Sequence, residues 1–207
     1  YDREFILTPD VLIPRPETEL LVREALNWAR CSGRKSMRIA DLCTGSGCIA
    51  WSMTLELPGS EVTAVDISDG ALAVAAGQRF VCDAPPKFIK ADVLTDVPDS
   101  LRAGEGFDIL VSNPPYVMDK EKALMRSNVL DHEPHLALFV SDDDPLVFYR
   151  AVADWAAQLL APDGFGIVEI NEALGAETSK VFIDAGFPTA QVLQDFSGRD
   201  RFVHFSR

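Results

Sequence analysis

The tetrapeptide Asn113-Pro114-Pro115-Tyr116 directly follows an apolar run. The Asn113 side chain carries both a carbonyl acceptor and an amide donor. Pro114 has no N–H, and Pro115 disfavours the α conformation at the residue before it, so the chain stays extended past the run. The Asn113 carbonyl and a nearby backbone carbonyl can then both accept hydrogen bonds from one planar –NH2 group, on which Tyr116 can stack. This spacing is typical of a device that positions a nitrogen for N-alkylation.

A competing interpretation is that the same tetrapeptide only ends a strand, since proline pairs often mark loops. The motif alone is compatible with both interpretations. The rest of the chain has to decide between them, beginning with the elements that would position Asn113.

Apolar runs alternate with helical patterns from residue 37 onward, which predicts βαβ units and an α/β fold with a mostly parallel sheet. Strands are expected near 37–43, 61–66, 87–91, 107–112 and 164–170. Helices are expected near 17–30, 48–56, 69–82, 145–160 and 174–185. The tail predicts an antiparallel hairpin formed by 190–196 and 201–206. A small leading β-hairpin is expected over 5–13, and an irregular lid over 117–143.

A second motif is the glycine-bearing turn after the first predicted strand, Asp-Leu-Cys-Thr-Gly-Ser-Gly at 41–47. Gly45 and Gly47 would let the backbone turn tightly and approach a ligand. Asp66 ends the next strand about 20 positions later, where an acidic residue accepts hydrogen bonds from ribose hydroxyls. An adenosine-bearing cofactor is therefore expected, although an ordinary βα turn without a ligand would show the same glycines.

The turn lacks the third glycine of a dinucleotide site, because position 50 is Ala, and it lacks the lysine of a phosphate-binding loop. Asp41 places a negative charge beside the turn, which suits a cationic or zwitterionic ligand such as S-adenosylmethionine better than a pyrophosphate. Asp92 follows the third strand, where it could accept from an adenine amino group while Val93 packs on the ring. Capping of the following turn is the alternative role of Asp92.

Composition narrows the possible partners. The chain has 207 residues and a net charge of -13, which would repel a nucleic-acid backbone. Its four cysteines and three histidines show no metal-ligand spacing, so no metal is expected. No apolar run is long enough to span a bilayer. Because the chain begins at Tyr1, a further segment is expected upstream.

With these motifs together, the chain resembles the class I S-adenosylmethionine-dependent methyltransferases. More narrowly, it resembles the HemK/PrmC family of protein-(glutamine-N5) methyltransferases of peptide-chain release factors. Three further stretches carry the narrower resemblance: Ile-Pro-Arg-Pro-Glu-Thr-Glu at 13–19, His-Glu-Pro-His-Leu-Ala-Leu at 132–138, and Gln-Asp-Phe-Ser-Gly-Arg-Asp-Arg at 194–201. Cys43 departs from the glycine most often found at that position.

The resemblance implies a Rossmann-like, mostly parallel seven-stranded sheet with helices on both faces and a C-terminal antiparallel hairpin. It implies that residues 17–207 form the catalytic domain, and that residues 1–16 lead in from an N-terminal helical domain that is missing here. The expected substrate is the glutamine of a Gly-Gly-Gln loop, whose –NH2 would donate to the Asn113 side-chain oxygen and the Pro114 carbonyl. The expected S-adenosylmethionine-binding residues are Arg15, Asp41, Cys43, Thr44, Gly45, Ser46, Gly47, Asp66, Ile67, Asp92, Val93 and Asn113.

The roles of Arg15, Glu17 and Glu133 have two interpretations each. Arg15 and Glu17 could shape the methionine and substrate pocket, or could belong to a helix start in which Glu17 favours the N-terminus. Glu133 is expected to anchor the lid rather than to act as a catalyst.

Two rival functions share these motifs. An N6-adenine DNA or RNA methyltransferase would use the same tetrapeptide on a flipped base, but the acidity and the segment at 13–19 speak against it. A cofactor-binding subunit without catalysis would have no need of Asn113. The chain is expected to be a monomer that binds no nucleic acid or membrane, in the cytoplasm of a bacterium or in an organelle of a eukaryote.

Overall fold

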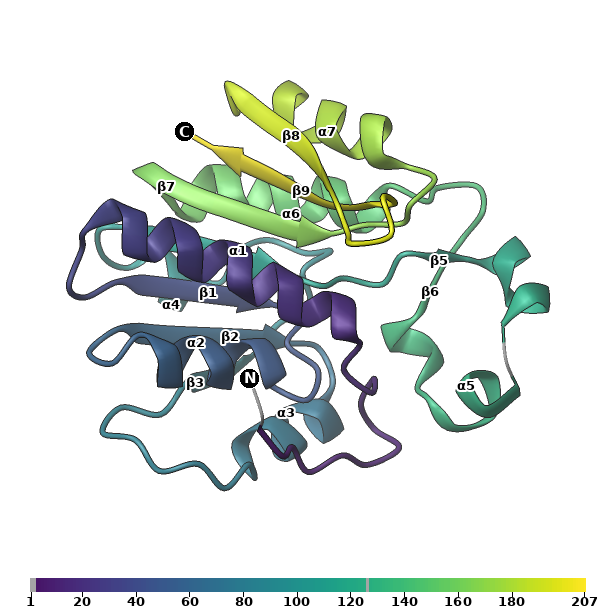
Figure 1. The fold of residues 1–207 in the computed structure, drawn as a ribbon, viewed down its shortest axis with the longest axis horizontal. Coiled ribbons are helices and arrows are strands. Elements are labelled where there is room, and N and C mark those ends of the chain that lie inside the picture. Colours follow the sequence, from purple (N-terminus) through teal and green to yellow (C-terminus); the bar gives the residue numbers. More distant parts are fainter. Residues whose placement is uncertain (1–2, 126) are drawn as a thin grey trace.

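The computed structural model describes residues 3–125 and 127–207. A seven-stranded sheet in the order β3-β2-β1-β4-β7-β9-β8 forms its centre (Figure 1). Neighbouring strands from β3 to β7 are parallel, and β9 is antiparallel to both β7 and β8. The strands are β1 Arg38–Leu42, β2 Glu61–Asp66, β3 Lys87–Lys90, β4 Phe107–Ser112, β7 Leu160–Glu169, β8 Thr189–Gln194 and β9 Asp200–Ser206. The predicted mostly parallel sheet with a closing hairpin is confirmed.

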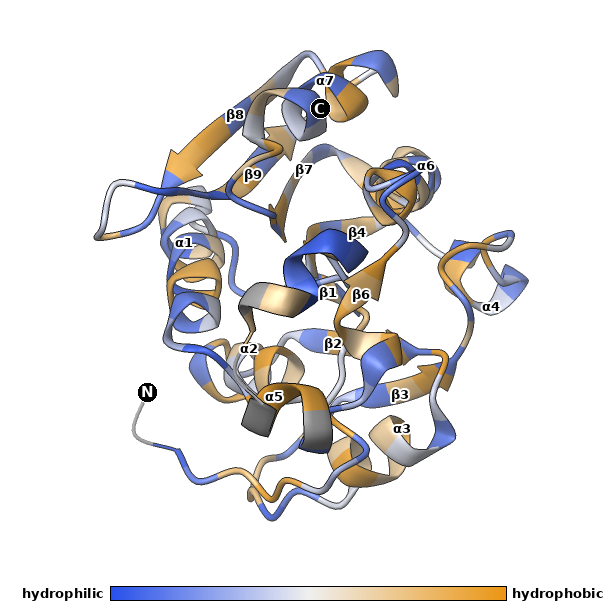
Figure 2. Ribbon diagram, turned by 90° about the vertical axis from the view of Figure 1, so that its right-hand side faces the viewer, coloured by the Kyte–Doolittle hydropathy of each residue, from blue (hydrophilic) through white to orange (hydrophobic). Residues whose placement is uncertain are grey.

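Helices cover both faces of the sheet, because successive strand residues point to opposite sides. Ile39 packs with α1 (Pro16–Ser32) and α2 (Cys48–Glu56) in one core, whereas Ala40 belongs to the core under the other face. Figure 2 looks towards the lid, with α1 on one side of the strands and α4 and α6 on the other. The helices of the second face are α4 Asp99–Arg102, α6 Val147–Leu159 and α7 Gly175–Asp184.

The lid over 117–143 contains short elements where an irregular loop is expected. Its strands β5 (Val117–Met118) and β6 (Phe139–Val140) pair in parallel and form a separate two-stranded sheet. Between them lie η1 Asp119–Leu124, α5 Ser127–His132 and η2 His135–Ala137. Figure 1 shows this part beyond the strand ends of the main sheet.

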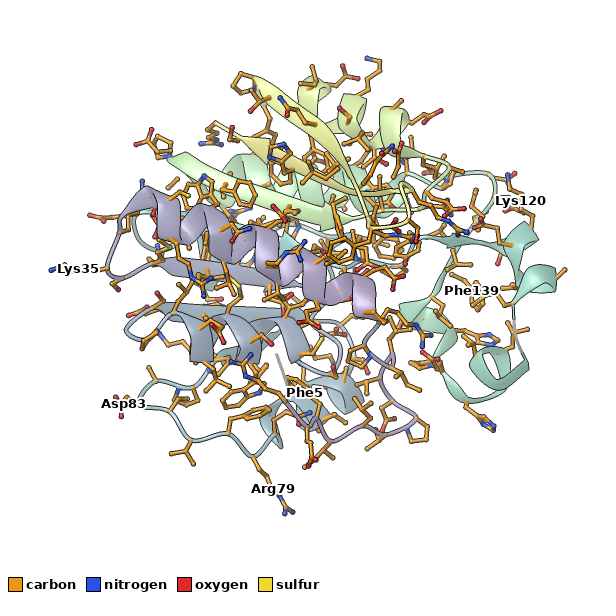
Figure 3. The ribbon with its side chains drawn as sticks, in the orientation of Figure 1. Phe5, Lys35, Arg79, Asp83, Lys120 and Phe139 are labelled. Carbon is orange, nitrogen blue, oxygen red and sulfur yellow. The ribbon has the colours of Figure 1, made fainter. Side chains whose placement is uncertain are left out.

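The predicted leading β-hairpin is wrong, since residues 3–15 contain no strand. A turn at Val11 is present, with its N–H donating to the Thr8 carbonyl at 3.2 Å. The Gln78 side chain replaces the missing strand partner: its oxygen accepts from Ile6 N at 2.9 Å and its nitrogen donates to Ile6 O at 2.8 Å. Phe5 packs edge-on against Phe80 below α2 (Figure 3).

Helix α3 (Asp69–Ala76) is shorter than predicted, because Gly77 forms its C-cap. Its N-terminus is capped by Ser68, whose side chain accepts from Ala71 N. Strand β7 begins earlier than predicted, and a register shift against β4 accommodates Pro162, which has no N–H to donate. Within the described residues, no helix is both long and apolar enough to cross a membrane.

Candidate active site

A cavity of about 260 Å³ lies at the carboxyl ends of the parallel strands. This edge is where open α/β sheets bind ligands. Residues that follow β1, β2, β3 and β4 form its inner wall, and the leading segment and the lid close it from outside. Sequence reasoning did not assign the outer residues to the cofactor site, although four of them lie in the stretches at 13–19 and 132–138. They are Asp10, Val11, Leu12, Pro14, Pro134, Leu136 and Ala137.

Asp66 links the first two loops of the inner wall. Its Oδ2 accepts from Gly45 N at 2.9 Å, and its Oδ1 accepts from Ser68 N at 2.9 Å. These bonds fix the carboxylate at the cavity wall, where lone pairs remain for a ligand hydroxyl. Cys43, Thr44, Ser46, Ile67, Asp92 and Val93, all expected to bind the cofactor, also line the cavity.

Asp92 caps a turn and also lies where it could contact a ligand. Its Oδ1 accepts from Leu94 N at 2.9 Å, so it caps the turn that follows β3. The same residue lines the cavity beside Val93. Capping of the turn therefore holds the side chain in place at the wall.

Asp41 lies behind the turn and is fully buried. Its Oδ2 accepts from Thr44 Oγ1 at 2.6 Å and from Ala50 N at 3.1 Å. Its Oδ1 has no hydrogen-bond partner among the described residues, and burial raises the pKa of this carboxyl to about 7. Asp41 therefore shapes the turn from within.

The turn itself needs left-handed backbone. Gly45 and Gly47 have φ of 54° and 77°, and a Cβ on Gly47 would meet the Ala75 Cβ at 2.9 Å. Cys43 has φ of 60°. Among the described residues other than glycine, it alone has a positive φ. A glycine at that position would adopt the same conformation without steric cost, which is a physical reason for glycine, rather than cysteine, to be common there.

Asn113 lies on the cavity wall beside Pro115. Its Nδ2 donates to Thr18 Oγ1 at 3.3 Å, and Thr18 Oγ1 donates to Glu169 Oε2 at 3.0 Å. The Tyr116 hydroxyl donates to Glu169 Oε1 at 2.9 Å. One carboxyl group therefore joins both side chains that the sequence predicts to hold a planar nitrogen.

Sequence reasoning missed Glu169. It lies at the end of β7, is 1% exposed, and burial raises the pKa of its carboxyl to about 7. A charged residue within the apolar run Phe-Gly-Ile-Val-Glu-Ile at 165–170 is the signal that could have identified it.

Asn171, also unpredicted, holds the backbone of the tetrapeptide. Its Nδ2 donates to Tyr116 O at 3.2 Å and to Glu121 Oε2 at 2.8 Å. Its N–H donates to the Tyr149 hydroxyl at 3.0 Å. The strand-to-loop junction after β4 is thus tied to both β7 and the lid.

Glu133 joins the lid to the leading segment. Its Oε1 accepts from Arg15 Nη2 at 2.7 Å, and its Oε2 accepts from Ile13 N at 3.1 Å. The residue is 6% exposed. This geometry fits the anchoring role, and Arg15, which was expected to bind the cofactor, is not among the residues that line the cavity. Among the described residues, no group of acidic, histidine or cysteine side chains could hold a metal ion.

Comparison with known proteins shows the family of this chain. The family model "Methyltransferase small domain" matches residues 17–136. The release factor glutamine methyltransferase of Bacteroides thetaiotaomicron is 42% identical over 99% of this chain and 71% of its own length. That of Flavobacterium psychrophilum is 40% identical over 96% of this chain and 69% of its own length. The chain belongs to the release factor glutamine methyltransferase family.

Solved structures show the same fold outside this family. The catalytic domain of hMettl16, in complex with an RNA hairpin, has a TM-score of 0.72 at 17% identity. The match covers 98% of this chain and 74% of the hMettl16 chain. A methyltransferase from Pyrococcus furiosus has a TM-score of 0.67 at 14% identity, and the match covers 98% of this chain and 87% of that protein. These structures show the fold alone, whereas the family match and the named relatives show that the chain is an S-adenosylmethionine-dependent methyltransferase.

Proposed function

We propose that this chain methylates the side-chain amide nitrogen of the glutamine in the Gly-Gly-Gln motif of a peptide-chain release factor, with S-adenosylmethionine as methyl donor. Relatives that are 42% and 40% identical bear the name release factor glutamine methyltransferase. The observation that carries the proposal is Asn113, which lies on the cavity wall with its amide nitrogen bonded to Thr18. Its carbonyl is thereby left for a substrate –NH2.

The cavity wall offers a suitable set of groups for S-adenosylmethionine. Asp66, already fixed by two backbone N–H groups, would accept from the ribose hydroxyls. Ile67 is 41% exposed, and both Ile67 and Val93 line the cavity, so they would offer apolar surface to the adenine ring. Asp92 would accept from the adenine amino group. The backbone of the turn at 43–47 would face the methionine portion, and Asp41 and Gly47 would support that turn from behind.

The chain contributes positioning to the reaction. The glutamine –NH2 would donate one hydrogen to the Asn113 side-chain oxygen and one to the Pro114 carbonyl, while Tyr116 packs on the amide plane. An amide nitrogen is a poor nucleophile because its lone pair is delocalised, so holding it at attack distance supplies most of the rate gain. When bound, the cofactor would supply an electrophilic methyl group on its sulfonium, whose S–C bond breaks on transfer to leave the thioether S-adenosylhomocysteine. The nitrogen loses its proton to solvent as the N–C bond forms, so no strong base is required beforehand.

Mass spectrometry of a release factor incubated with the protein and S-adenosylmethionine tests this function. We expect one added methyl group, mapped by peptide fragmentation to the glutamine of the Gly-Gly-Gln motif. A release factor with that glutamine changed to alanine is the matched control and should stay unmodified. Transfer of tritiated methyl groups to DNA or RNA, with none to the release factor, would instead support the N6-adenine alternative.

The remaining expectations form part of the same proposal. A release-factor substrate requires the protein to act where translation takes place, in the bacterial cytoplasm or in an organelle. The net charge of -13 argues against direct contact with nucleic acid. We propose residues 17–207 as the catalytic domain of a monomer, which light scattering at several concentrations would check.

A further inference from the structure

We propose that Thr18 and Glu169 are positioning residues that decide which end of the Asn113 side-chain amide faces the substrate. The proposal rests on the proposed function and adds to it the part of the protein that aims the amine-holding carbonyl. Neither the tetrapeptide nor the glycine turn contains these residues. Thr18 lies in α1 and Glu169 ends β7.

The hydrogen bonds have a fixed direction. An ionised carboxylate can only accept, and a threonine hydroxyl has a single hydrogen to donate. Thr18 donates that hydrogen to Glu169 Oε2, so its oxygen can only accept from Asn113. Only the –NH2 end of the Asn113 amide can supply a donor. The carbonyl end, on the other side of the planar group, must then point away from Thr18.

Burial makes this direction costly to reverse. Thr18 is 4% exposed and Glu169 is 1% exposed, so water cannot readily replace either partner. If the Asn113 amide turned over, two oxygens would face each other, or the Thr18 hydroxyl would have to leave Glu169. A buried acceptor without its donor is strongly destabilising. The network therefore selects one orientation before a substrate arrives.

The same carboxyl group also aims Tyr116. Its Oε1 accepts from the Tyr116 hydroxyl, while Oε2 accepts from Thr18. The aromatic ring and the Asn113 amide are thus set by a single group that does not itself line the cavity. Glu169 acts through its two neighbours and touches neither the substrate nor the cofactor.

Protonation of Glu169 would disturb one of its two hydrogen bonds, because a neutral carboxyl carries a single hydrogen, and the oxygen that holds it would donate to Thr18 or to Tyr116 instead of accepting from it. Burial raises the pKa of this group to about 7, against the lowering effects of Tyr116, Thr18 and Arg201. Charged and titratable groups from several elements interact electrostatically with the Glu169 carboxyl. They are Glu17 in α1, Cys48 in α2, Tyr116 after β4, Tyr149 in α6 and Arg201 in β9. We expect activity to rise with pH through about 7, as Glu169 ionises.

The decisive comparison is Thr18→Val against Thr18→Ser. Valine keeps the shape but removes the hydroxyl, whereas serine keeps the hydroxyl. In single-turnover methylation of a release factor, Thr18→Val should be slower by about tenfold or more, with unchanged S-adenosylmethionine affinity. Thr18→Ser should stay within about threefold of wild type. Equal rates for the two variants would overturn the proposal.

Glu169→Gln supplies a second readout that a merely structural role would not move. The wild-type rate should rise through about pH 7, and this variant should be slow and lack that rise. If the variant kept the same pH profile, the rise would belong to another group and the role of Glu169 would be refuted. Thermal melting of each variant separates a loss of folding from a loss of positioning.

A measurement without substrate distinguishes this inference from the proposed function. In a nuclear magnetic resonance spectrum of the free protein, one Asn113 Nδ2 hydrogen should exchange slowly with solvent in the wild type and in Thr18→Ser, and quickly in Thr18→Val. That exchange pattern supports the orienting network even if no release factor is methylated. Absence of methylation would refute only the proposed function. Equal exchange in all three proteins would refute the network.

Discussion

The β1–β2 side of the cavity is built from neighbouring loops, whereas the β4–β7 side joins residues from distant parts of the chain. Asp66 accepts from Gly45 N and Ser68 N, which lie 21 and 2 positions away. By contrast, Thr18 and Glu169 are separated by 151 positions, and Asn113 and Thr18 by 95. The first half is a backbone cradle supported by carboxylates. The second half is a network of side chains.

This difference indicates separate functions for the halves. A cradle of backbone N–H groups can hold a cofactor through many small contacts, so one substitution weakens binding by a limited factor. A side-chain network that orients one carbonyl can no longer position the substrate nitrogen when that carbonyl is removed. Substitutions in the two halves should therefore affect different kinetic constants.

The largest effect is expected for Asn113→Ala. Loss of the carbonyl that holds the glutamine nitrogen should lower turnover by about a hundredfold or more, since the nucleophile is no longer held in position. The dissociation constant for S-adenosylmethionine, measured by calorimetry, should change by less than about threefold. A variant that methylated at nearly the wild-type rate would show that the tetrapeptide is only a strand end.

The converse effect is expected for Asp66→Ala on the cradle side. The dissociation constant for S-adenosylmethionine should rise about 10- to 100-fold, the range for loss of hydrogen bonds to a charged group. Turnover at saturating cofactor should fall much less. Asp66→Asn is the matched control, because it keeps one acceptor and the side-chain size. If Asp66→Ala reduced turnover as strongly as Asn113→Ala at saturation, the two halves would not be separable.

A smaller effect is expected for Glu133→Gln, which keeps the shape but removes the charge that pairs with Arg15. We expect a loss of about 1–2 kcal/mol in the free energy of unfolding in urea, because Glu133 is buried and holds two segments together. Asp184→Asn, which breaks an exposed ion pair with Lys180, is the control and should change stability by less than about 0.5 kcal/mol. Similar values for the two variants would argue against an anchoring role.

The smallest effect is expected for Cys43→Gly. Glycine removes the strain of a left-handed residue, about 1 kcal/mol, but it also adds about 0.5–1 kcal/mol of unfolded-chain entropy. These terms nearly cancel, so the melting temperature should shift by only a few degrees. Cys43→Ala keeps the strain but avoids the entropy cost of glycine, so it should melt within a few degrees of Cys43→Gly. If both variants melted far below the wild type, the thiol that both of them lack, rather than the backbone conformation, would determine stability here.

The sequence was sufficient for the cradle because its parts are adjacent in a strand–turn–helix pattern. Asp66 and the glycine turn could be located from spacing alone, and Asn113 could be located from its prolines. Glu169 could not be assigned a role, because its partners become neighbours only when β7 inserts between β4 and β9. The leading hairpin was predicted wrongly for a related reason: the Gln78 side chain, from a distant loop, takes the place of a second strand.

The long separation between Thr18 and Glu169 also sets the order in which the site can be assembled. During synthesis the chain emerges from its N-terminus, so the strands that carry the cradle leave the ribosome well before β7. The network of Thr18 and Asn113 cannot form before Glu169 has been synthesised, and Glu169 is enclosed only after β9 has paired with β7. We therefore expect a nascent chain to gain a cofactor-binding surface first and the aimed carbonyl last. A chain interrupted before β7 could not hold a substrate in register with its methyl donor.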